Sequence, residues 1–173
     1  MSRLAVKRDL ELMVLGGLEA QVPVIIGSAG GSGSDVQVDW TLEILAEICA
    51  EHGLSPRVAV VRSEIHRDFL KTKIQNGQTA PLGPIAPLTP DAADDTDRVV
   101  AMIGVEPFQA ALDAGAEIVI AGRSSDAAIY AAIPVRLGMD PGLAWHMGKI
   151  IECGAQVVEP REGQDCVSGP LYD

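Results

Sequence analysis

Short apolar runs alternate with segments of helical periodicity along most of this 173-residue chain. Four runs rich in β-branched and aliphatic residues predict strands, namely residues 22–26, 57–62, 99–103 and 117–121. Strands that alternate with helices in this way indicate βαβ crossovers, and therefore a mostly parallel sheet with helices on both faces. The sequence predicts one α/β domain over residues 1–173, doubly wound and with three layers, α/β/α.

The expected helices begin and end at recognisable signals. An amphipathic helix is predicted over residues 3–20 by the spacing of its leucines. Asp35 is a suitable N-cap for a second helix, which Gly53 ends. Further helices are expected over residues 66–75, 106–114, 125–137 and 141–153.

Residues 79–97 form the one irregular stretch. Prolines recur there at every third position from Pro81 to Pro90, and four aspartates follow between Asp91 and Asp97. This proline spacing favours an extended, polyproline-like path. Two interpretations stay open: a loop that covers the space between elements, or a mobile lid over a site.

Composition narrows the classes of partner. Asp and Glu outnumber Lys and Arg by 24 to 13, which gives a net charge of -11. A general nucleic-acid binder needs a basic face, so that class is not expected, whereas a few backbone N–H groups can still hold a small anion. No apolar run approaches the roughly 20 residues that span a bilayer, so no membrane association is expected.

The cysteines and the first residues suggest a cytoplasmic location. Cys49, Cys153 and Cys166 are an odd number without a C-x-x-C pair, which is typical of reduced thiols. The first residues are amphipathic and of mixed charge, without the apolar core of a signal peptide. Cys49 is expected to be a packing residue in its helix.

The turn over residues 27–34 is the first candidate for chemistry. Four glycines and three serines follow a predicted buried strand and precede a helix, where backbone N–H groups and the helix N-terminus favour an anion. The segment lacks the lysine of a P-loop and misses the G-x-G-x-x-G spacing. Its glycines either make only a tight turn or bind a phosphate, a CoA or a carboxylate, with these ligand-binding candidates: Ser28, Gly30, Gly31, Ser32 and Gly33.

The second candidate turn follows the strand predicted over residues 117–121. Ligands of open α/β sheets bind at the carboxyl ends of the strands, and Arg123 falls at such an end. Its guanidinium suits a carboxylate or a phosphate, and Ser124 and Ser125 add hydroxyl groups beside it. Asp126 is a candidate acid or base, or else a helix cap.

Other titratable residues have weaker signals. His146 and Lys149 lie on one face of the last predicted helix and, with Asp126, are the candidates for catalytic proton transfer; a packed histidine and a snorkelling lysine are the alternative. His146 and Cys153 have no clear third partner, so no metal site is expected. Glu106 precedes a proline and is a cap or a catalytic carboxylate, while His52 and His66 are expected at the surface.

Several of these motifs together resemble one family. The runs are IGSAGGSGS at 26–34, VEPFQAALDAG at 105–115, VIAGRSSD at 119–126 and GLAWHMGKIIECGA at 142–155, with PLGP at 81–84. They are similar to the AtuA family, named for acyclic terpene utilisation, over most of the chain from about Arg3 to Cys166. Members of that family are longer, which implies that this chain is an internal fragment, the core of a longer protein whose sheet is incomplete at one or both edges.

The resemblance also implies a function. Named members belong to bacterial gene clusters that degrade citronellol- and geraniol-type compounds through CoA thioesters. We therefore expect a catabolic enzyme, or its core, that acts on a small anionic substrate: a branched or terpenoid carboxylate or CoA thioester. The candidate residues suit a lyase or hydratase step. The alternative is a non-catalytic ligand-binding or assembly subunit; the cofactor stays open, and partners are a second copy or the missing segments of the longer chain.

Overall fold

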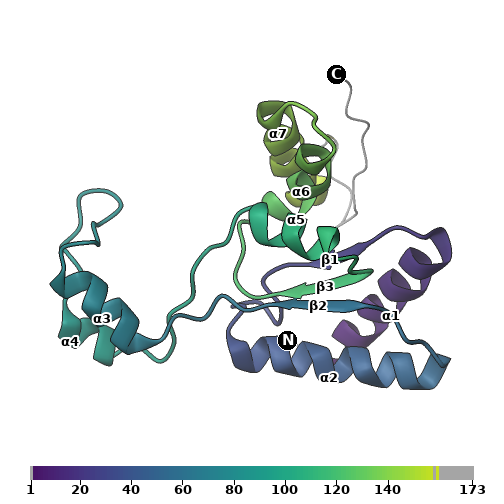
Figure 1. The fold of residues 1–173 in the computed structure, drawn as a ribbon, viewed down its shortest axis with the longest axis horizontal. Helices are drawn as coiled ribbons and strands as arrows, with labels where there is room; N and C mark the ends of the chain where they lie inside the picture. The colour runs from purple at the N-terminus through teal and green to yellow at the C-terminus, as the bar shows by residue number, and fades with distance from the viewer. Residues whose placement is uncertain (1, 158, 160–173) are drawn as a thin grey trace.

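The computed structural model describes residues 2–157 and 159, and Figure 1 shows their arrangement. Helices and strands follow one another in this order: α1 Arg3–Ala20, β1 Val24–Ile26, α2 Asp35–His52, β2 Val58–Val61, α3 Arg67–Gln75, α4 Pro90–Asp94, α5 Glu106–Asp113, β3 Ile118–Ala121, α6 Ala128–Arg136, α7 Pro141–Glu152 and the 3-10 turn η1 Gly154–Val157. Three of the four predicted strands and all the predicted helices are confirmed, with shorter bounds for most of them.

The sheet has three strands in the order β1-β3-β2, and both pairings are parallel. The central strand β3 has the sequence IVIA, and all four of its residues are buried. A parallel strand covered on both faces needs such an unbroken apolar run. Ile118 of β3 pairs with Val24 on one side and Val58 on the other, which sets the register of the whole sheet.

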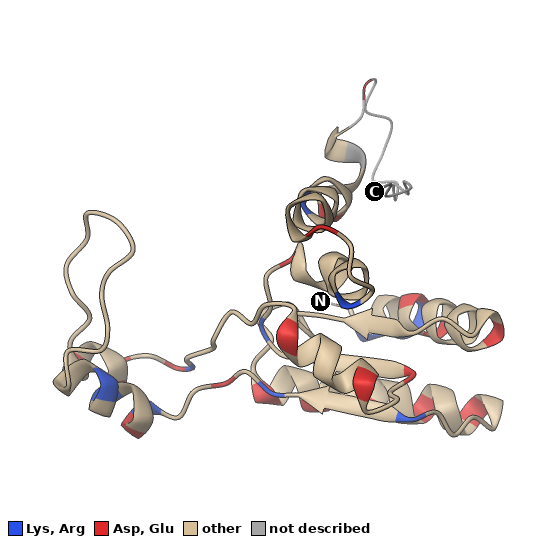
Figure 2. Ribbon diagram, turned by 45° about the horizontal axis from the view of Figure 1, so that its top comes forward, with Lys and Arg blue, Asp and Glu red and all other residues tan. Residues whose placement is uncertain are grey.

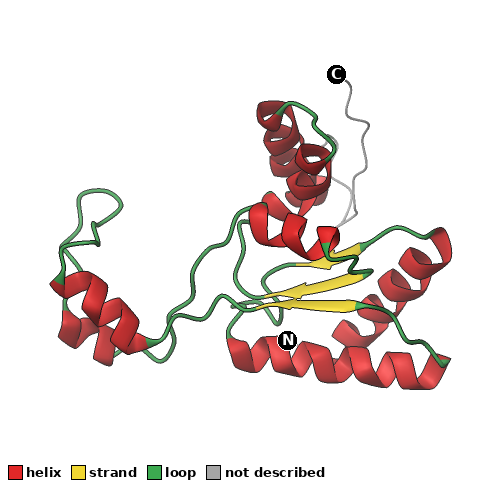
Figure 3. Ribbon diagram, viewed as in Figure 1, coloured by secondary structure: helices red, strands yellow, loops and turns green. Residues whose placement is uncertain are grey.

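Helices cover both faces of this sheet, as Figure 3 shows. Ile118 and Ile120 of β3 pack with α1 and α2 on one face. Val119 and Ala121 point to the other face and pack with α5, α6 and α7. Because successive strand residues alternate between faces, one four-residue strand supplies the centre of both cores. The predicted three-layer α/β/α architecture is therefore confirmed.

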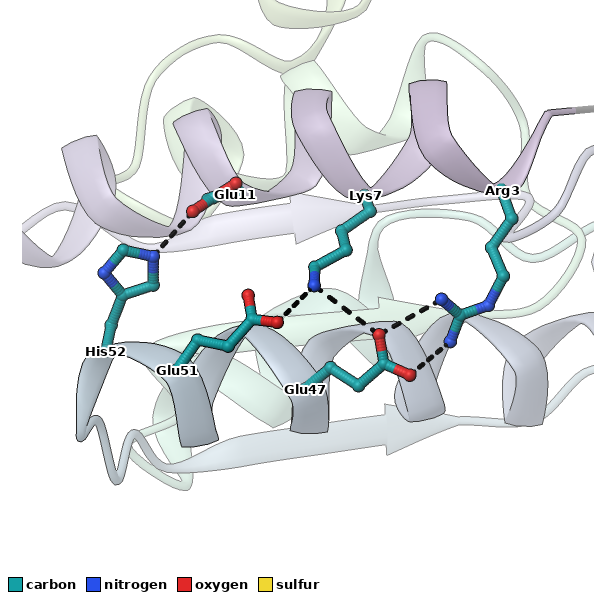
Figure 4. A network of polar contacts seen from close by, with 6 residues as sticks. All are labelled: Arg3, Lys7, Glu11, Glu47, Glu51 and His52. Carbon is teal, nitrogen blue, oxygen red and sulfur yellow. Dashed lines mark hydrogen bonds and ion pairs between the residues drawn. The ribbon is translucent and has the colours of Figure 1, made fainter.

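Two features hold α1 and α2 in place. Gly17 lets α1 approach β1 closely, since a Cβ there would lie 2.3 Å from the Val24 side chain. Along the solvent side, a row of ion pairs connects the two helices (Figure 4), and its members are Arg3 with Glu47 at 2.7 Å, Lys7 with Glu51 at 2.5 Å and Glu11 with His52 at 2.6 Å. The residue numbers rise together along the row, so α1 and α2 run parallel.

The strand predicted over 99–103 is wrong. Val100 forms an isolated antiparallel bridge with Glu64, and Ile103 forms an isolated parallel bridge with Ser124. This segment crosses the carboxyl ends of β2 and β3 instead of lying beside a strand. Its N–H groups therefore bond with the loops of two different strands, at Ser63 O from Ala101 and at Arg123 O from Ile103.

The proline- and aspartate-rich stretch 79–97 is not wholly irregular. Thr89 accepts a hydrogen bond from the Ala92 N–H at 3.2 Å and caps the short helix α4, with Pro90 in its first turn. Figure 1 shows that the stretch lies far from the sheet, in an extension that also contains α3. In this structure it neither fills the space between core elements nor covers the carboxyl edge.

Candidate functional site at the carboxyl edge

The loops after β1 and β3 are joined through their backbones at the carboxyl edge of the sheet. Ser28 N–H donates to Gly122 O at 2.9 Å, and Ala29 N–H donates to Ala121 O at 3.0 Å. Arg123 N–H donates back to Gly33 O at 3.2 Å. The glycine-rich loop, residues 27–34, and the arginine loop, residues 122–127, therefore lie against each other as one unit.

Ser28 and Ser124 make the side-chain contact between these loops. The Ser28 hydroxyl accepts the Ser124 N–H at 3.3 Å and lies 3.5 Å from the Ser124 hydroxyl. Ser28 has a positive φ of 47°, a conformation that serines adopt rarely and at a cost. Ser124 is almost completely buried, whereas Ser125 beside it is half-buried. Two of the expected ligand-binding serines thus contact each other directly.

Gly33 is needed for the close approach of the two loops. Its φ is +72°, and a Cβ at this position would lie 2.1 Å from the Arg123 backbone nitrogen. Gly30 and Gly31 also have positive φ values, of 67° and 104°. A side chain at position 33 would therefore separate the glycine-rich loop from Arg123.

Most of the loop N–H groups that could donate hydrogen bonds to an anion already donate to acceptors within the protein. Gly31 N–H donates to Ser28 O at 2.8 Å, and Gly33 N–H donates to Ala29 O at 3.1 Å. Both the N–H and the hydroxyl of Ser32 donate to the Gln37 side chain, at 2.7 and 2.5 Å. An anion at these amides would have to replace an internal acceptor. The tight-turn interpretation thus describes the observed hydrogen bonds.

A carboxylate of the protein itself occupies the N-terminus of α2. Glu64, just after β2, accepts the Asp35 N–H at 2.7 Å and an Arg98 N–H at 2.8 Å. The Asp35 hydrogen bond, followed by Arg98, holds the pKa of Glu64 below its ordinary value although burial opposes this. Sequence reasoning missed Glu64 and took Asp35 as the N-cap, whereas the N-cap is Ser34 and Asp35 is the first helical residue.

Arg123 and Asp126 form a loose ion pair of 3.7 Å, with 29% of the Arg123 side chain exposed. The Asp126 side chain is more exposed. Asp126 does not cap α6, because Ala127 is the N-cap of that helix and no side-chain cap hydrogen bond is formed there. The backbone of Arg123 is thus fixed by hydrogen bonds, whereas its side chain is partly exposed and held only by a loose ion pair. The guanidinium can accept a carboxylate or phosphate from outside.

Helix α7 lies directly against the end of the arginine loop. A Cβ on Gly148 would lie 2.6 Å from the Ala127 carbonyl oxygen, so the glycine permits this packing. Lys149, 69% exposed, forms an ion pair with Glu152, which raises the pKa of the lysine; Cys153 and Asp126 add weaker contributions in the same direction. Asp126 thus pairs with Arg123, and Lys149 with Glu152, while His146 is exposed.

A hollow of 270 Å³ lies between the glycine-rich loop and α1. Its wall combines loop residues 27–31 with apolar side chains of α1, Leu10 and Met13 among them. Asp9 and Thr41 add polar groups. The glycine-rich loop therefore borders both a largely apolar hollow and Arg123.

The remaining candidates have structural surroundings. Glu106 is the first residue of α5 after the N-cap Val105, where a carboxylate interacts favourably with the helix N-terminus. His52 pairs with Glu11, and His66 is exposed as predicted. Burial raises the pKa of the Cys49 thiol, in line with its packing role. Cys166 lies outside the described residues.

Two features of residues 2–157 and 159 bear on metal binding and on membrane insertion. Among these residues, no group of three or more His, Cys, Asp and Glu side chains is placed to hold a metal ion. Within the same part of the chain, no helix has the length and apolar character needed to cross a bilayer.

Fold and loops define an open α/β protein whose candidate site lies at the carboxyl edge of a parallel sheet. The chain belongs to the AtuA family, described as acyclic terpene utilisation family protein AtuA, whose pattern matches residues 6–162. This membership connects the chain with acyclic terpene utilisation. No significant match was found among curated proteins or among solved structures.

Proposed function

We propose that the chain binds a small anionic substrate of terpene catabolism, a branched or terpenoid carboxylate or its CoA thioester, at the carboxyl edge. The observation that carries this proposal is the position of Arg123. Its backbone N–H donates to Gly33 O, while its side chain is partly exposed and forms only a loose ion pair of 3.7 Å with Asp126. A permanently charged fork in this position suits a carboxylate or phosphate.

The apolar part of the substrate has a place on the same loop. The 270 Å³ hollow is lined by residues 27–31 and by α1, so an aliphatic chain could lie there with its polar end toward the loop. Ligand sites combine such apolar walls with a few polar groups. Ser28 contributes to both parts, because it lines the hollow and contacts Ser124.

In the catalytic form of the proposal, Asp126 and the residues of α7 transfer protons in a lyase or hydratase step. Lys149, which is charged at neutral pH, would act as the proton donor once substrate separates it from Glu152, because the pairing with Glu152 raises its pKa and opposes proton release. Asp126 and His146 are the candidate bases, and both are exposed. The cytoplasm, where CoA thioesters are used, is the proposed location.

A non-catalytic binding or assembly subunit is the second candidate. One observation favours it: Lys149 is already paired with Glu152 and is therefore not free to transfer a proton. In this case Arg123 binds the ligand and the group around Asp126 performs no chemistry.

Calorimetry with coenzyme A, inorganic phosphate and 3-methylbutanoate as probes tests binding. Arg123→Ala should weaken binding at least about tenfold, as expected for a lost charge-assisted hydrogen bond. Arg57→Ala is the matched control, because Arg57 is exposed and lies just before β2, at the opposite end of the sheet from Arg123. Absence of binding heat with all three probes would overturn both candidate functions.

Mass spectrometry of branched 2-enoyl-CoA and 3-hydroxyacyl-CoA thioesters incubated with the protein separates the two candidates, because these thioesters can gain or lose one water. An enzyme should change the substrate mass by one water, and Asp126→Asn and His146→Ala should abolish this change without loss of binding. A pure binder should leave the thioesters intact.

A further inference from the structure

Residues 65–99 form an arm that extends from the carboxyl edge of the sheet, as Figure 1 shows. The arm contains α3, the tip loop 76–89 and α4. At its base, Ile65 N–H donates to Val99 O at 2.8 Å, and an Arg67 guanidinium N–H donates to Asp97 O at 3.0 Å. The two connecting segments run side by side, so the arm is a single projecting unit.

The arm buries very little of its own apolar surface. The nine-residue helix α3 has no buried residue, and in α4 only Ala93 is buried. Leu82 and Ile85 of the tip loop are 98% and 66% exposed, and Phe69 and Leu88 are exposed as well. Helices this short are marginal in water without packing, and clustered exposed apolar residues mark interaction sites. The exposed apolar side chains of the arm therefore indicate a surface that binds another molecule.

Charge on the arm is divided between its two helical parts. α3 contains three basic residues and one acidic residue, whereas residues 90–97 contain four aspartates and no basic residue. Lys71 and Asp94 already form an ion pair within the arm. Figure 2 shows both colours on this projecting unit. An arm that is basic on one helix and acidic on the other is complementary to a copy of itself turned by a two-fold axis.

We propose that two copies of this chain form a dimer through their arms. The two-fold axis places α3 of each copy against residues 90–97 of the other, and it brings the exposed tip-loop side chains Leu82 and Ile85 into the shared contact. Complementary potentials set the register, while apolar burial supplies the affinity. Prolines of the tip loop restrict its backbone before docking and so reduce the entropy lost on association. This inference is independent of the proposed ligand.

Sedimentation velocity of the whole chain over a concentration series tests the dimer. The wild-type protein should shift from monomer to dimer as its concentration rises to about 100 μM, a range that detects weak interfaces. Leu82→Asp together with Ile85→Asp should weaken dimerisation at least tenfold. Leu137→Asp is the matched control, since Leu137 is also exposed but lies after α6. At concentrations where the chain is monomeric, circular dichroism melting should be the same for both variants, because none of these side chains is buried within a single chain.

Charge reversal tests the arm-to-arm arrangement itself. Lys73→Glu and Asp95→Lys should each weaken the dimer, because each brings like charges together across the axis. Both changes in one chain should restore it, since the two charges exchange sides. A monomeric wild-type protein at every concentration overturns the proposal. So does a dimer that tolerates the tip-loop changes, which would place the interface elsewhere.

Discussion

Glu64 lies at the end of β2 and accepts the backbone N–H of Asp35, the first residue of α2, at 2.7 Å. The helix N-terminus attracts a negative charge, and here the charge comes from a different strand of the same chain. This contact ties the end of an edge strand to the helix that follows β1. It also means that the position where an anion would bind at α2 is filled by the protein.

Glu64→Ala is predicted to destabilise the fold by about 1–2 kcal/mol, because the change removes a charged acceptor from Asp35 and leaves Arg98 unpaired there. Urea unfolding followed by circular dichroism gives the free energy of unfolding. Glu19→Ala is the control, since Glu19 is an exposed carboxylate near the end of α1. Equal losses for the two variants would contradict the role of Glu64.

The same carboxylate predicts a pH dependence. The pKa of Glu64 is lowered in the folded state below its ordinary value of 4.5. Its contribution is therefore present above about pH 4.5 and disappears as the pH falls through the lower folded-state pKa. The difference in unfolding free energy between wild type and Glu64→Gln should be constant near neutral pH and shrink in acid. A difference that grows in acid would show the opposite shift.

Gly33→Ala is predicted to be strongly destabilising for two reasons. The φ of +72° is unfavourable for alanine, and the added Cβ would lie 2.1 Å from the Arg123 nitrogen. We expect a loss of more than about 2 kcal/mol in unfolding free energy. Gly53→Ala has a similar φ of +64° with nothing within 4 Å of the new Cβ, so it isolates the strain of the backbone. Equal losses would show that the close approach to Arg123 has no cost.

The ion pairs of Figure 4 should contribute little individually and should depend on salt. Glu47 forms ion pairs with both Arg3 and Lys7, which hold the pKa of its carboxyl group below the ordinary value. Glu47→Lys should therefore lower the melting temperature more than Glu47→Gln, because it adds repulsion. Thermal melts at low salt and at about 1 M NaCl provide the measurement, since the Debye length falls to about 3 Å there. A gap between the variants that persists at high salt would argue against electrostatics.

Residue patterns predicted the elements of the core because their signals are local. The run IVIA of β3 and the spacing of the leucines in α1 each predict their element without knowledge of its partners. The leucine pattern is less accurate for burial, because Leu4 and Leu12 are exposed and Val14 is buried. Segment 99–103 has the composition of a strand because β-branched residues also suit an extended backbone that forms single hydrogen bonds with the loops after two different strands. The residues of that segment do not indicate which other parts of the chain it will contact.

Site residues were predicted unevenly for the same physical reason. The strand-end rule brought the glycine-rich loop and Arg123 to one edge, and the structure shows Arg123 N–H bonded to Gly33 O. By contrast, Glu64 and Asp35 are 29 residues apart, and no sequence signal connects a carboxylate after one strand with the helix after another. The acceptor of each N–H group in the glycine-rich loop also depends on the folded structure, as with the Ser32 N–H, which donates to the Gln37 side chain.

Ser63→Ala is predicted to leave stability unchanged or to raise it slightly. Ser63 is buried, and among the described residues its hydroxyl has no hydrogen-bond partner. An unsatisfied buried hydroxyl costs free energy, so its removal should raise the unfolding free energy by up to about 1 kcal/mol. Thr41→Val is the contrasting variant, because the Thr41 hydroxyl donates to Gln37 O at 2.8 Å and its loss should destabilise the fold. Chemical unfolding of both variants under one set of conditions gives the comparison. A clear loss of stability in Ser63→Ala would show that the hydroxyl bonds to a group that occupies the carboxyl edge in solution.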